Sequence, residues 1–166
     1  MESRDQLFQQ LLAEHSGGVS RVAATYARGI GEREDLTQEI WLAVWRALPA
    51  FRGEASLKTF VYRIAHNRSV SALVRRRPPG DALQDAEEPE DPTPGPAQQY
   101  AALRDAQSLL AAVQKLPLGL RQTLSLRLEG LSYEEIAEVL GVSESNVAVR
   151  LNRARQRLSA RLTREE

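Results

Sequence analysis

The stretch that decides the fold of this 166-residue chain is residues 131–158, LSYEEIAEVLGVSESNVAVRLNRARQRL. Ser132 and Glu135 form a capping-box pattern, which predicts that a helix begins at this point. Gly141 can adopt the left-handed conformation that ends a helix, and Ser143 can cap a second helix directly after it. Two helices joined at a glycine turn are typical of a helix-turn-helix.

The second of these helices is predicted to have one apolar face and one polar face. The apolar face repeats at three- and four-residue steps and should pack inward: Val147, Leu151, Ala154 and Leu158. The opposite face carries side chains that can pair with base edges or meet a thymine methyl group in a major groove: Ser145, Asn146, Val149, Asn152, Arg153 and Gln156. Arg150 and Arg155 flank this face and suit phosphates. Residues 145–164 hold six arginines and no acidic residue, which favours DNA binding over the alternative, an ordinary basic surface helix.

Helical periodicity predicts helices along the rest of the chain as well. Apolar residues from Leu7 to Tyr26 repeat at three- and four-residue steps, which indicates two helices broken at Gly17 and Gly18. The other expected helices cover residues 34–48, 56–76, 98–115, 118–129, 132–140 and 143–162. Because no stretch shows convincing strand alternation, the fold class is predicted to be all-α.

A segment rich in proline and acid separates two basic parts of the chain. Residues 78–96 contain six of the eight prolines and six carboxylates, and such a composition does not bury enough apolar surface to fold. The net charge is zero overall, but it is +4 over residues 1–77, −6 over residues 78–96 and +2 over residues 97–166. We therefore expect two small helical domains, residues 1–77 and 98–166, joined by a flexible linker at residues 78–97.

Composition excludes several classes of function. The chain has no cysteine, so it has no disulfide, no thiol nucleophile and no cysteine-ligated zinc. Its two histidines, His15 and His66, have no ligand-type spacing, so we expect surface histidines and no metal. No run of ~20 apolar residues predicts a membrane span, and residues 1–10 do not resemble a secretory signal, which favours a cytoplasmic protein. No nucleophile with a base and no phosphate loop can be identified, so we expect no enzyme activity and no cofactor.

A second acid-free stretch, residues 58–77, combines positive charge with aromatic rings. Its basic residues are Lys58, Arg63, Arg68, Arg75, Arg76 and Arg77. Such a combination suits single-stranded DNA, because bases stack on rings while cations follow the phosphates. Phe60 lies close to the apolar stripe of this helix, so we expect it in the core. Tyr62 should project farther out, which makes it the better stacking candidate; the alternative is a plain surface tyrosine.

Two parts of the chain resemble one family. Residues 34–53, EDLTQEIWLAVWRALPAFRG, and residues 57–77, LKTFVYRIAHNRSVSALVRRR, resemble region 2 of the extracytoplasmic-function (ECF) sigma factors of bacterial RNA polymerase. Residues 116–155 resemble region 4 of the same family. The resemblance implies an alternative sigma factor that binds core RNA polymerase, directs it to specific promoters and helps to open them for transcription initiation.

The resemblance also implies site residues and partners. Region 2 would bind the clamp helices of the largest polymerase subunit through the outer face of one helix, at Asp35, Gln38, Glu39, Trp41 and Arg46. Its residues for the minus-ten promoter element would be Gly53, Glu54, Ala55, Ser56, Lys58, Tyr62, Arg63, Asn67, Arg75 and Arg76. In that set, residues 53–56 would capture a base flipped from the non-template single strand, with Asn67 beside it. Region 4 would bind the polymerase flap and read the minus-thirty-five element as duplex DNA.

The family further implies a regulatory partner and a path for the linker. An anti-sigma factor would mask both regions. The linker would pass through the polymerase cleft, where its carboxylates can mimic the charge of RNA: Asp81, Asp85, Glu87, Glu88, Glu90 and Asp91. Phe60 and Ser71 stand where the family commonly has Trp and Asp, and Ala148 and Val149 stand where it often has a basic residue and serine, so the promoter sequence is not carried over. The competing interpretation is a helix-turn-helix regulator that binds duplex DNA without polymerase.

Overall fold

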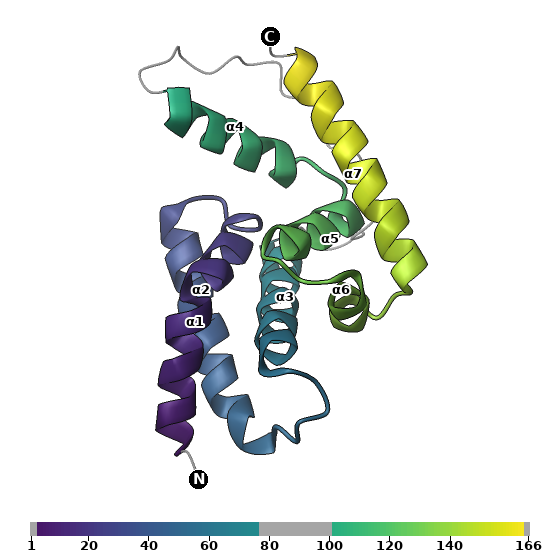
Figure 1. The fold of residues 1–166 in the computed structure, drawn as a ribbon. Helices are drawn as coiled ribbons and strands as arrows, with labels where there is room; N and C mark the ends of the chain where they lie inside the picture. Colours follow the sequence, from purple (N-terminus) through teal and green to yellow (C-terminus); the bar gives the residue numbers. More distant parts are fainter. Residues whose placement is uncertain (1–2, 77–100, 165–166) are drawn as a thin grey trace.

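The structure, a computed structural model, describes residues 3–76 and 101–164. Over these residues every regular element is a helix, so the predicted all-α fold class is confirmed there (Figure 1). The elements are α1 (Arg4–Ala24), α2 (Ile30–Ala47), the short 3-10 helix η1 (Leu48–Ala50), α3 (Leu57–Arg76), α4 (Ala101–Gln114), α5 (Leu118–Leu128), α6 (Tyr133–Leu140) and α7 (Glu144–Arg164). Arg77 and the predicted linker, residues 78–97 with its six carboxylates, lie outside the described residues.

Helices α1, α2 and α3 pack together as an N-terminal lobe (Figure 1). Helix α2 turns Leu36, Ile40 and Val44 inward at helical spacing, and all three are buried. Burying one such side chain stabilises a fold by about 1.5–3 kcal/mol, so this stripe determines which face of α2 meets its neighbours. The opposite face of α2 is left for solvent or a partner.

Helix α1 runs unbroken through Gly17 and Gly18, so the predicted break at these glycines is wrong. Gly18 is buried, and a Cβ atom at this position would overlap the Tyr62 hydroxyl and approach Glu129 Oε2 to 2.9 Å. Glycine at this position therefore allows the close approach of three chain segments, and it does not end a helix.

Helices α6 and α7 form the predicted helix-turn-helix. The capping box closes in both directions, because Glu135 N donates to Ser132 Oγ at 3.1 Å and Ser132 N donates to Glu135 Oε1 at 2.9 Å. Gly141 ends α6 in the left-handed conformation, with φ of 69°. At the start of α7, Ser143 Oγ accepts a hydrogen bond from Asn146 N at 3.1 Å. Each of these caps confirms its prediction.

Helix boundaries differ from the sequence prediction by a few residues. Helix α2 begins at Ile30 and not at residue 34, and Glu32 in its first turn accepts hydrogen bonds from Arg28 N and Arg28 Nε, both at 2.9 Å. A carboxylate in the first turn is favourable because it lies near free backbone N–H groups and the positive end of the helix dipole. Even with such extensions, no helix in the described part of the chain is long and apolar enough to cross a membrane.

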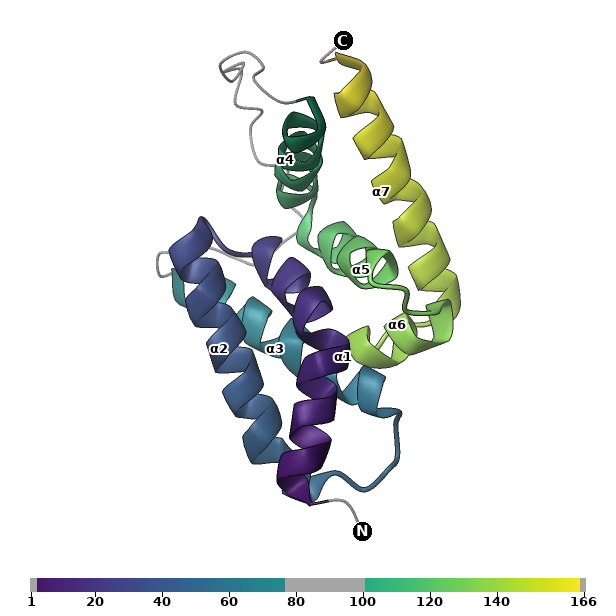
Figure 2. The same ribbon diagram turned by 60° about the vertical axis from the view of Figure 1, so that its left-hand side comes forward.

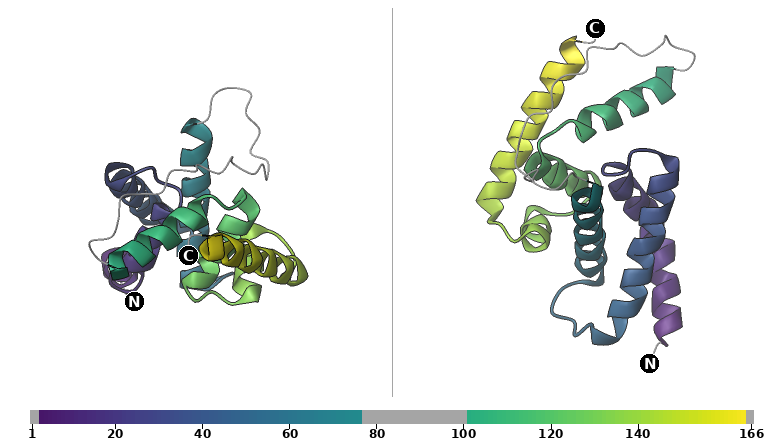
Figure 3. Two further views of the ribbon diagram at one scale, coloured as in Figure 1. Left: turned by 90° about the horizontal axis from the view of Figure 1, so that it is seen from above. Right: turned by 180° about the vertical axis from the view of Figure 1, so that it is seen from behind.

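Helices α4 to α7 form a C-terminal lobe, which shares one continuous core of buried side chains with the N-terminal lobe. Figure 2 and the right-hand view of Figure 3 show α5 and α6 between the N-terminal lobe and α7. Helix α7 therefore lies at the outer edge of the molecule, where one of its faces is open to solvent.

Candidate nucleic-acid interface

Helix α7 presents the predicted base-reading residues to solvent. Val147, Leu151 and Ala154 each have 0% of their surface exposed, and Leu158 is half-buried on the same stripe. Because this stripe sets the rotation of the helix, the opposite face points outward. Apart from the half-buried Arg150, all the predicted contact residues on α7 are exposed: Ser145, Asn146, Val149, Asn152, Arg153, Arg155 and Gln156.

Helices α5 and α6 hold α7 in place from behind. Leu126, Leu131 and Ile136 on these two helices and the turn between them are at most 1% exposed. A binding residue on a tightly packed helix keeps a defined direction, which recognition of base edges requires. Helix α7 is therefore a rigid platform for its exposed side chains.

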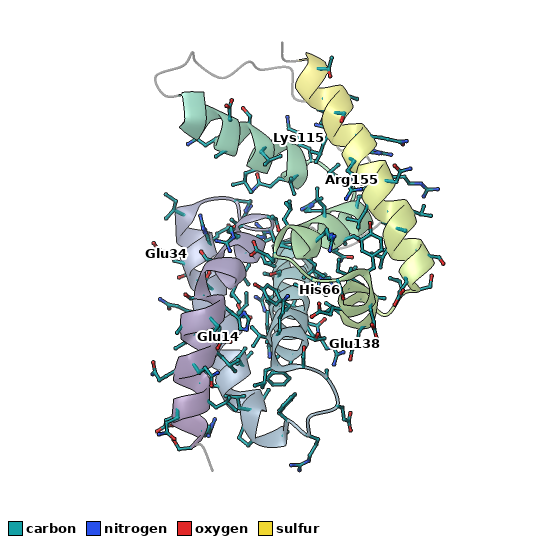
Figure 4. The ribbon with its side chains drawn as sticks, viewed as in Figure 1. Glu14, Glu34, His66, Lys115, Glu138 and Arg155 are labelled. Carbon is teal, nitrogen blue, oxygen red and sulfur yellow. The ribbon has the colours of Figure 1, made fainter. Side chains whose placement is uncertain are left out.

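The exposed face of α7 has the chemistry of a duplex reader. Asn and Gln amides pair with adenine and arginines pair with guanine, while Val149, 48% exposed, can meet a thymine methyl group. Residues 145–164 contain no acid, so the field over this helix attracts phosphates. Figure 4 marks Arg155, one of these cations, on α7.

Helix α3 carries the residues that are predicted to bind single-stranded DNA, and several of them already contact other parts of the protein. Asn67 is exposed. Lys58 Nζ donates to Gly130 O at 3.2 Å, and Arg63 Nη2 lies 3.6 Å from Glu138 Oε1, so the C-terminal lobe engages both cations. Figure 4 marks Glu138 on α6.

The last two candidates on α3 pair with carboxylates of α2. Arg75 Nη2 lies 3.2 Å from Glu39 Oε2, and Arg76 Nη1 lies 2.7 Å from Glu32 Oε2. Arg76 also donates to Tyr26 O. The Arg75 side chain is 58% exposed and that of Arg76 only 19%, so Arg75 remains available for a partner while Arg76 joins the two helices.

Tyr62 does not project outward, and this prediction is wrong. Only 3% of the residue is exposed, its ring lies 5.8 Å from that of His15 on α1, and burial raises the pKa of its hydroxyl to about 12. The rotation of α3 alone suggested exposure, but α1 packs over the same side of the helix. Phe60 is half-buried with its ring centroid 4.9 Å from that of Phe51, as its predicted place in the core requires.

The loop before α3 is formed by the predicted base-capturing residues. Gly53 has a φ of 76° and is exposed, as are Glu54 and Ser56, whereas Ala55 is half-buried. Ser56 Oγ also accepts a hydrogen bond from Thr59 N at 3.1 Å, so it caps the start of α3. The loop is thereby fixed to the same helix that carries Asn67.

The outer face of α2 carries most of the residues that are predicted to bind the polymerase, and one of them lies elsewhere. Asp35, Gln38 and Arg46 are exposed, and Glu39 is half-buried beside Arg75. Trp41, however, is only 8% exposed and packs edge-on against Phe8, with ring centroids 5.9 Å apart. Six positions separate Trp41 from Asp35, and that spacing turns the indole away from the outer face of the helix.

Sequence reasoning missed one residue of this face, Leu42. It is 47% exposed and lies at helical spacing between Gln38 and Arg46. The same spacing could have identified it, since residues 35, 38, 39, 42 and 46 share one side of a helix. The polar face thus has an apolar centre, as protein-binding surfaces commonly do.

His66 is another correction, because it is half-buried and not a surface histidine. Figure 4 marks it on α3. Burial lowers the pKa of its imidazole from 6.5 to about 4. The neutral ring is therefore the form that the folded protein holds over most of the acidic range.

The burial of His66 predicts a loss of stability at acidic pH. Below pH 6.5 the unfolded chain takes up a proton at this residue, whereas the folded chain does so only near pH 4. Proton uptake by the unfolded chain alone favours unfolding. This residue therefore causes no loss of stability above about pH 6.5 and an increasing loss as the pH falls toward 4. Between pH 7.5 and 4.5, the free energy of unfolding of the wild type should fall by about 2 kcal/mol more than that of His66→Gln. Urea denaturation at several pH values measures the difference, and parallel curves for the two proteins would contradict it.

Together, the exposed basic helix of the helix-turn-helix and the second basic helix define a class: an all-helical DNA-binding protein with two candidate nucleic-acid faces. Comparison with known families finds matches to two separate parts of the chain. The description "Sigma-70 region 2" matches residues 11–78, and "Sigma-70, region 4" matches residues 106–158.

Individual relatives agree with these matches. The RNA polymerase sigma-H factor of Pseudomonas aeruginosa is 34% identical over 174 residues, covering 93% of this chain and 86% of the relative. The ECF RNA polymerase sigma-E factor of Escherichia coli K12 is 33% identical over 160 residues, covering 90% of this chain and 83% of the relative. The chain belongs to the ECF family of RNA polymerase sigma factors, and it functions as an alternative sigma factor in transcription initiation.

Two solved structures have the same fold over nearly the whole chain. CnrH, in complex with the cytosolic domain of CnrY, has a TM-score of 0.72 and 27% identity, and the match covers 96% of this chain and 89% of CnrH. RpoE of Bartonella quintana, in complex with the anti-sigma factor NepR, has a TM-score of 0.73 and 26% identity, with coverage of 94% and 96%.

Proposed function

We propose that this sigma factor divides promoter recognition between two faces. Helix α7 reads the minus-thirty-five element as duplex DNA, and α3 with the preceding loop captures non-template bases of the opened minus-ten element. The observation that carries the proposal is the face of α7, where exposed amides and arginines lie opposite the stripe of Val147, Leu151 and Ala154, each 0% exposed. The two regions would be residues 1–77 and 98–166, joined by a linker at residues 78–97.

The partner on the N-terminal side would be core RNA polymerase. The exposed face of α2, with Asp35, Gln38 and Arg46 around Leu42, offers polar specificity and an apolar centre for docking on the clamp helices of the largest subunit. The C-terminal region would bind the flap. Bond formation belongs to the polymerase, so the sigma factor contributes binding and strand opening and has no enzyme activity of its own.

Strand opening would use side chains that are held at defined positions. Flipping a base out of the duplex costs a few kcal/mol because the base must unstack, and binding in a polar pocket with basic surroundings can offset this cost. The loop residues 53–56 lie at the N-terminus of α3, and Asn67 is exposed farther along the same helix. Arg75, largely exposed, is a candidate for phosphate contact beyond that pocket.

An anti-sigma factor is the expected regulator. CnrH and RpoE, the structural relatives, were solved with CnrY and with the anti-sigma factor NepR. The likeness to both extends over more than nine tenths of this chain, which supports a regulator of the same class here. The site of action would be the bacterial cytoplasm, where the polymerase works.

The Asn67→Ala variant tests the strand-capturing role. The side chain is exposed, so its removal should leave the fold intact, while opening of the promoter by the holoenzyme should fall about tenfold, the effect of one lost hydrogen bond of about 1.4 kcal/mol. Binding to a duplex with the minus-thirty-five element alone should be unchanged. Permanganate reactivity of unpaired thymines measures opening.

Gln9→Ala is the matched control for this variant, because Gln9 is an exposed amide on α1 outside both proposed faces. It should open promoters like the wild type. Normal opening by Asn67→Ala would remove this residue from the site.

A further inference from the structure

The face of α3 that carries Asn67 also carries an exposed apolar side chain, Val74. Asn67, Ser71 and Val74 follow one another at steps of four and three residues, so they share one side of the helix. All three residues are exposed, and 47% of the surface of Val74 is accessible. Val74 therefore lies on the face that is proposed to bind the minus-ten element, but it is not one of the residues that the family resemblance places there.

The surroundings of Val74 are positively charged, and its apolar surface is small. Arg75 follows it directly with a side chain that is 58% exposed, and residues 58–77 contain no acidic residue. Val70, one helical turn earlier, is half-buried. An apolar surface of one or two valines is far too small to dock a protein, whereas it is large enough to cover a methyl group.

Helix α7 repeats this arrangement. Val149 is 48% exposed and is followed directly by Arg150, within the acid-free residues 145–164. Six large apolar side chains are exposed in the described part of the chain, and of these only Val74 and Val149 lie in the two acid-free basic stretches. On a helix that faces DNA, an apolar side chain can contact the C5 methyl group by which thymine differs from the other bases.

The position of Val74 along α3 determines which part of a promoter it can reach. With a rise of about 1.5 Å per residue, Val74 lies about 10 Å beyond Asn67 along the helix axis, which is the length of about three base steps. The loop of residues 53–56 precedes the other end of α3. Val74 is therefore far from the loop that is proposed to capture an unpaired base.

We propose that Val74 is a specificity-determining residue: it contacts the methyl group of a thymine in the duplex that directly borders the opened minus-ten element. The inference rests on the proposed role of α3. Arg75 binds a neighbouring phosphate, and Val74 shields the thymine methyl group from water. A promoter with thymine at this position is therefore bound more tightly than one with another base.

Removing the methyl group of the thymine and truncating the valine should have similar effects. Deoxyuridine lacks the C5 methyl group of thymine but keeps its pairing edge, so replacing that thymine should weaken binding by the wild-type holoenzyme about fourfold, the effect of exposing one buried methyl group. Val74→Ala should bind the thymine promoter more weakly by a similar factor. It should bind the thymine and deoxyuridine promoters equally, because the contact is already lost.

The experiment measures equilibrium binding of the holoenzyme to a fluorescent fragment of a promoter that run-off transcription selects. The fragment is duplex upstream and carries only the non-template strand in the minus-ten element, so that strand opening does not contribute. Each thymine in the duplex next to the junction is replaced in turn by deoxyuridine. Thermal melting followed by circular dichroism verifies that each variant is folded.

Ile30→Ala is the matched control, because Ile30 is a β-branched residue of the same lobe that is 74% exposed and lies outside both proposed DNA faces. This variant should bind like the wild type and still distinguish thymine from deoxyuridine.

Two results would overturn the proposal. Equal binding of every deoxyuridine fragment by the wild type would show that no thymine methyl group is contacted in this duplex, as would selected promoters that share no thymine there. Full discrimination by Val74→Ala would exclude Val74 from the contact, and weaker binding of core polymerase by the same variant would place Val74 at a protein interface. Both results leave the proposed function standing, since normal promoter opening by Asn67→Ala is the result that rejects α3 as the strand-capturing face.

Discussion

Leu151→Ala is expected to lower the free energy of unfolding by about 2–5 kcal/mol, which makes it the most destabilising change considered for this protein. Leu151 has 0% exposure and lies in the middle of the stripe that attaches α7 to α5 and α6. Truncation to alanine removes buried methyl groups and leaves a cavity that the packed helices do not fill. Because the same stripe sets the rotation of α7, the loss should also reduce promoter binding.

Val149→Ala is the matched control for this prediction. Val149 lies two residues away on the opposite face of α7 and is 48% exposed, so its truncation should change stability by less than about 0.5 kcal/mol. Urea denaturation followed by far-UV circular dichroism compares the two variants. Equal losses of stability would mean that α7 is not attached by this stripe.

Arg153→Ala is expected to weaken recognition of the minus-thirty-five element by about 1–3 kcal/mol and to relax the preference at one promoter position. Arg153 is exposed in the middle of the polar face of α7, where a guanidinium can reach a guanine edge. Selection of promoters from a randomised library by the holoenzyme measures both the loss and its position.

Arg153→Lys separates base recognition from simple attraction to phosphate. Lysine keeps the charge but not the planar two-point donor of arginine, so at a base contact it should also relax the preference. At a phosphate contact, by contrast, the lysine variant should bind DNA much like the wild type, and the alanine variant should bind all sequences more weakly by the same factor. That uniform loss would contradict base reading by Arg153.

The helix-turn-helix could be predicted from the sequence because its determinants are local. The cap at Ser132 and Glu135, the left-handed Gly141 and the stripe through Leu151 each depend on residues within a few turns of one another. Such signals operate before any distant part of the chain is in place. The exposed face of α7 followed directly, because it is opposite the stripe.

Errors arose where a distant segment decides the environment of a side chain. Periodicity within α3 predicts an outward Tyr62, but α1 and the turn between α5 and α6 cover it. The family motif predicts Trp41 on an outer face, whereas in the structure Trp41 packs edge-on against Phe8 of α1 in the core. The predicted helix break at Gly18 is wrong for a related reason. A glycine can mark either a turn or a close approach between chain segments. Only the tertiary structure distinguishes the two.

Run-off transcription from a promoter library shows whether this chain confers promoter recognition on core RNA polymerase. Purified core polymerase is assayed with and without the protein, and the protein alone is assayed for specific binding to the same DNA. Specific transcripts are expected only when both components are present, and the sequences that the transcribed promoters share then give the promoter elements. Specific binding of duplex DNA by the protein alone, with no transcripts when polymerase is added, would rule out promoter recognition through the polymerase and indicate a stand-alone regulator.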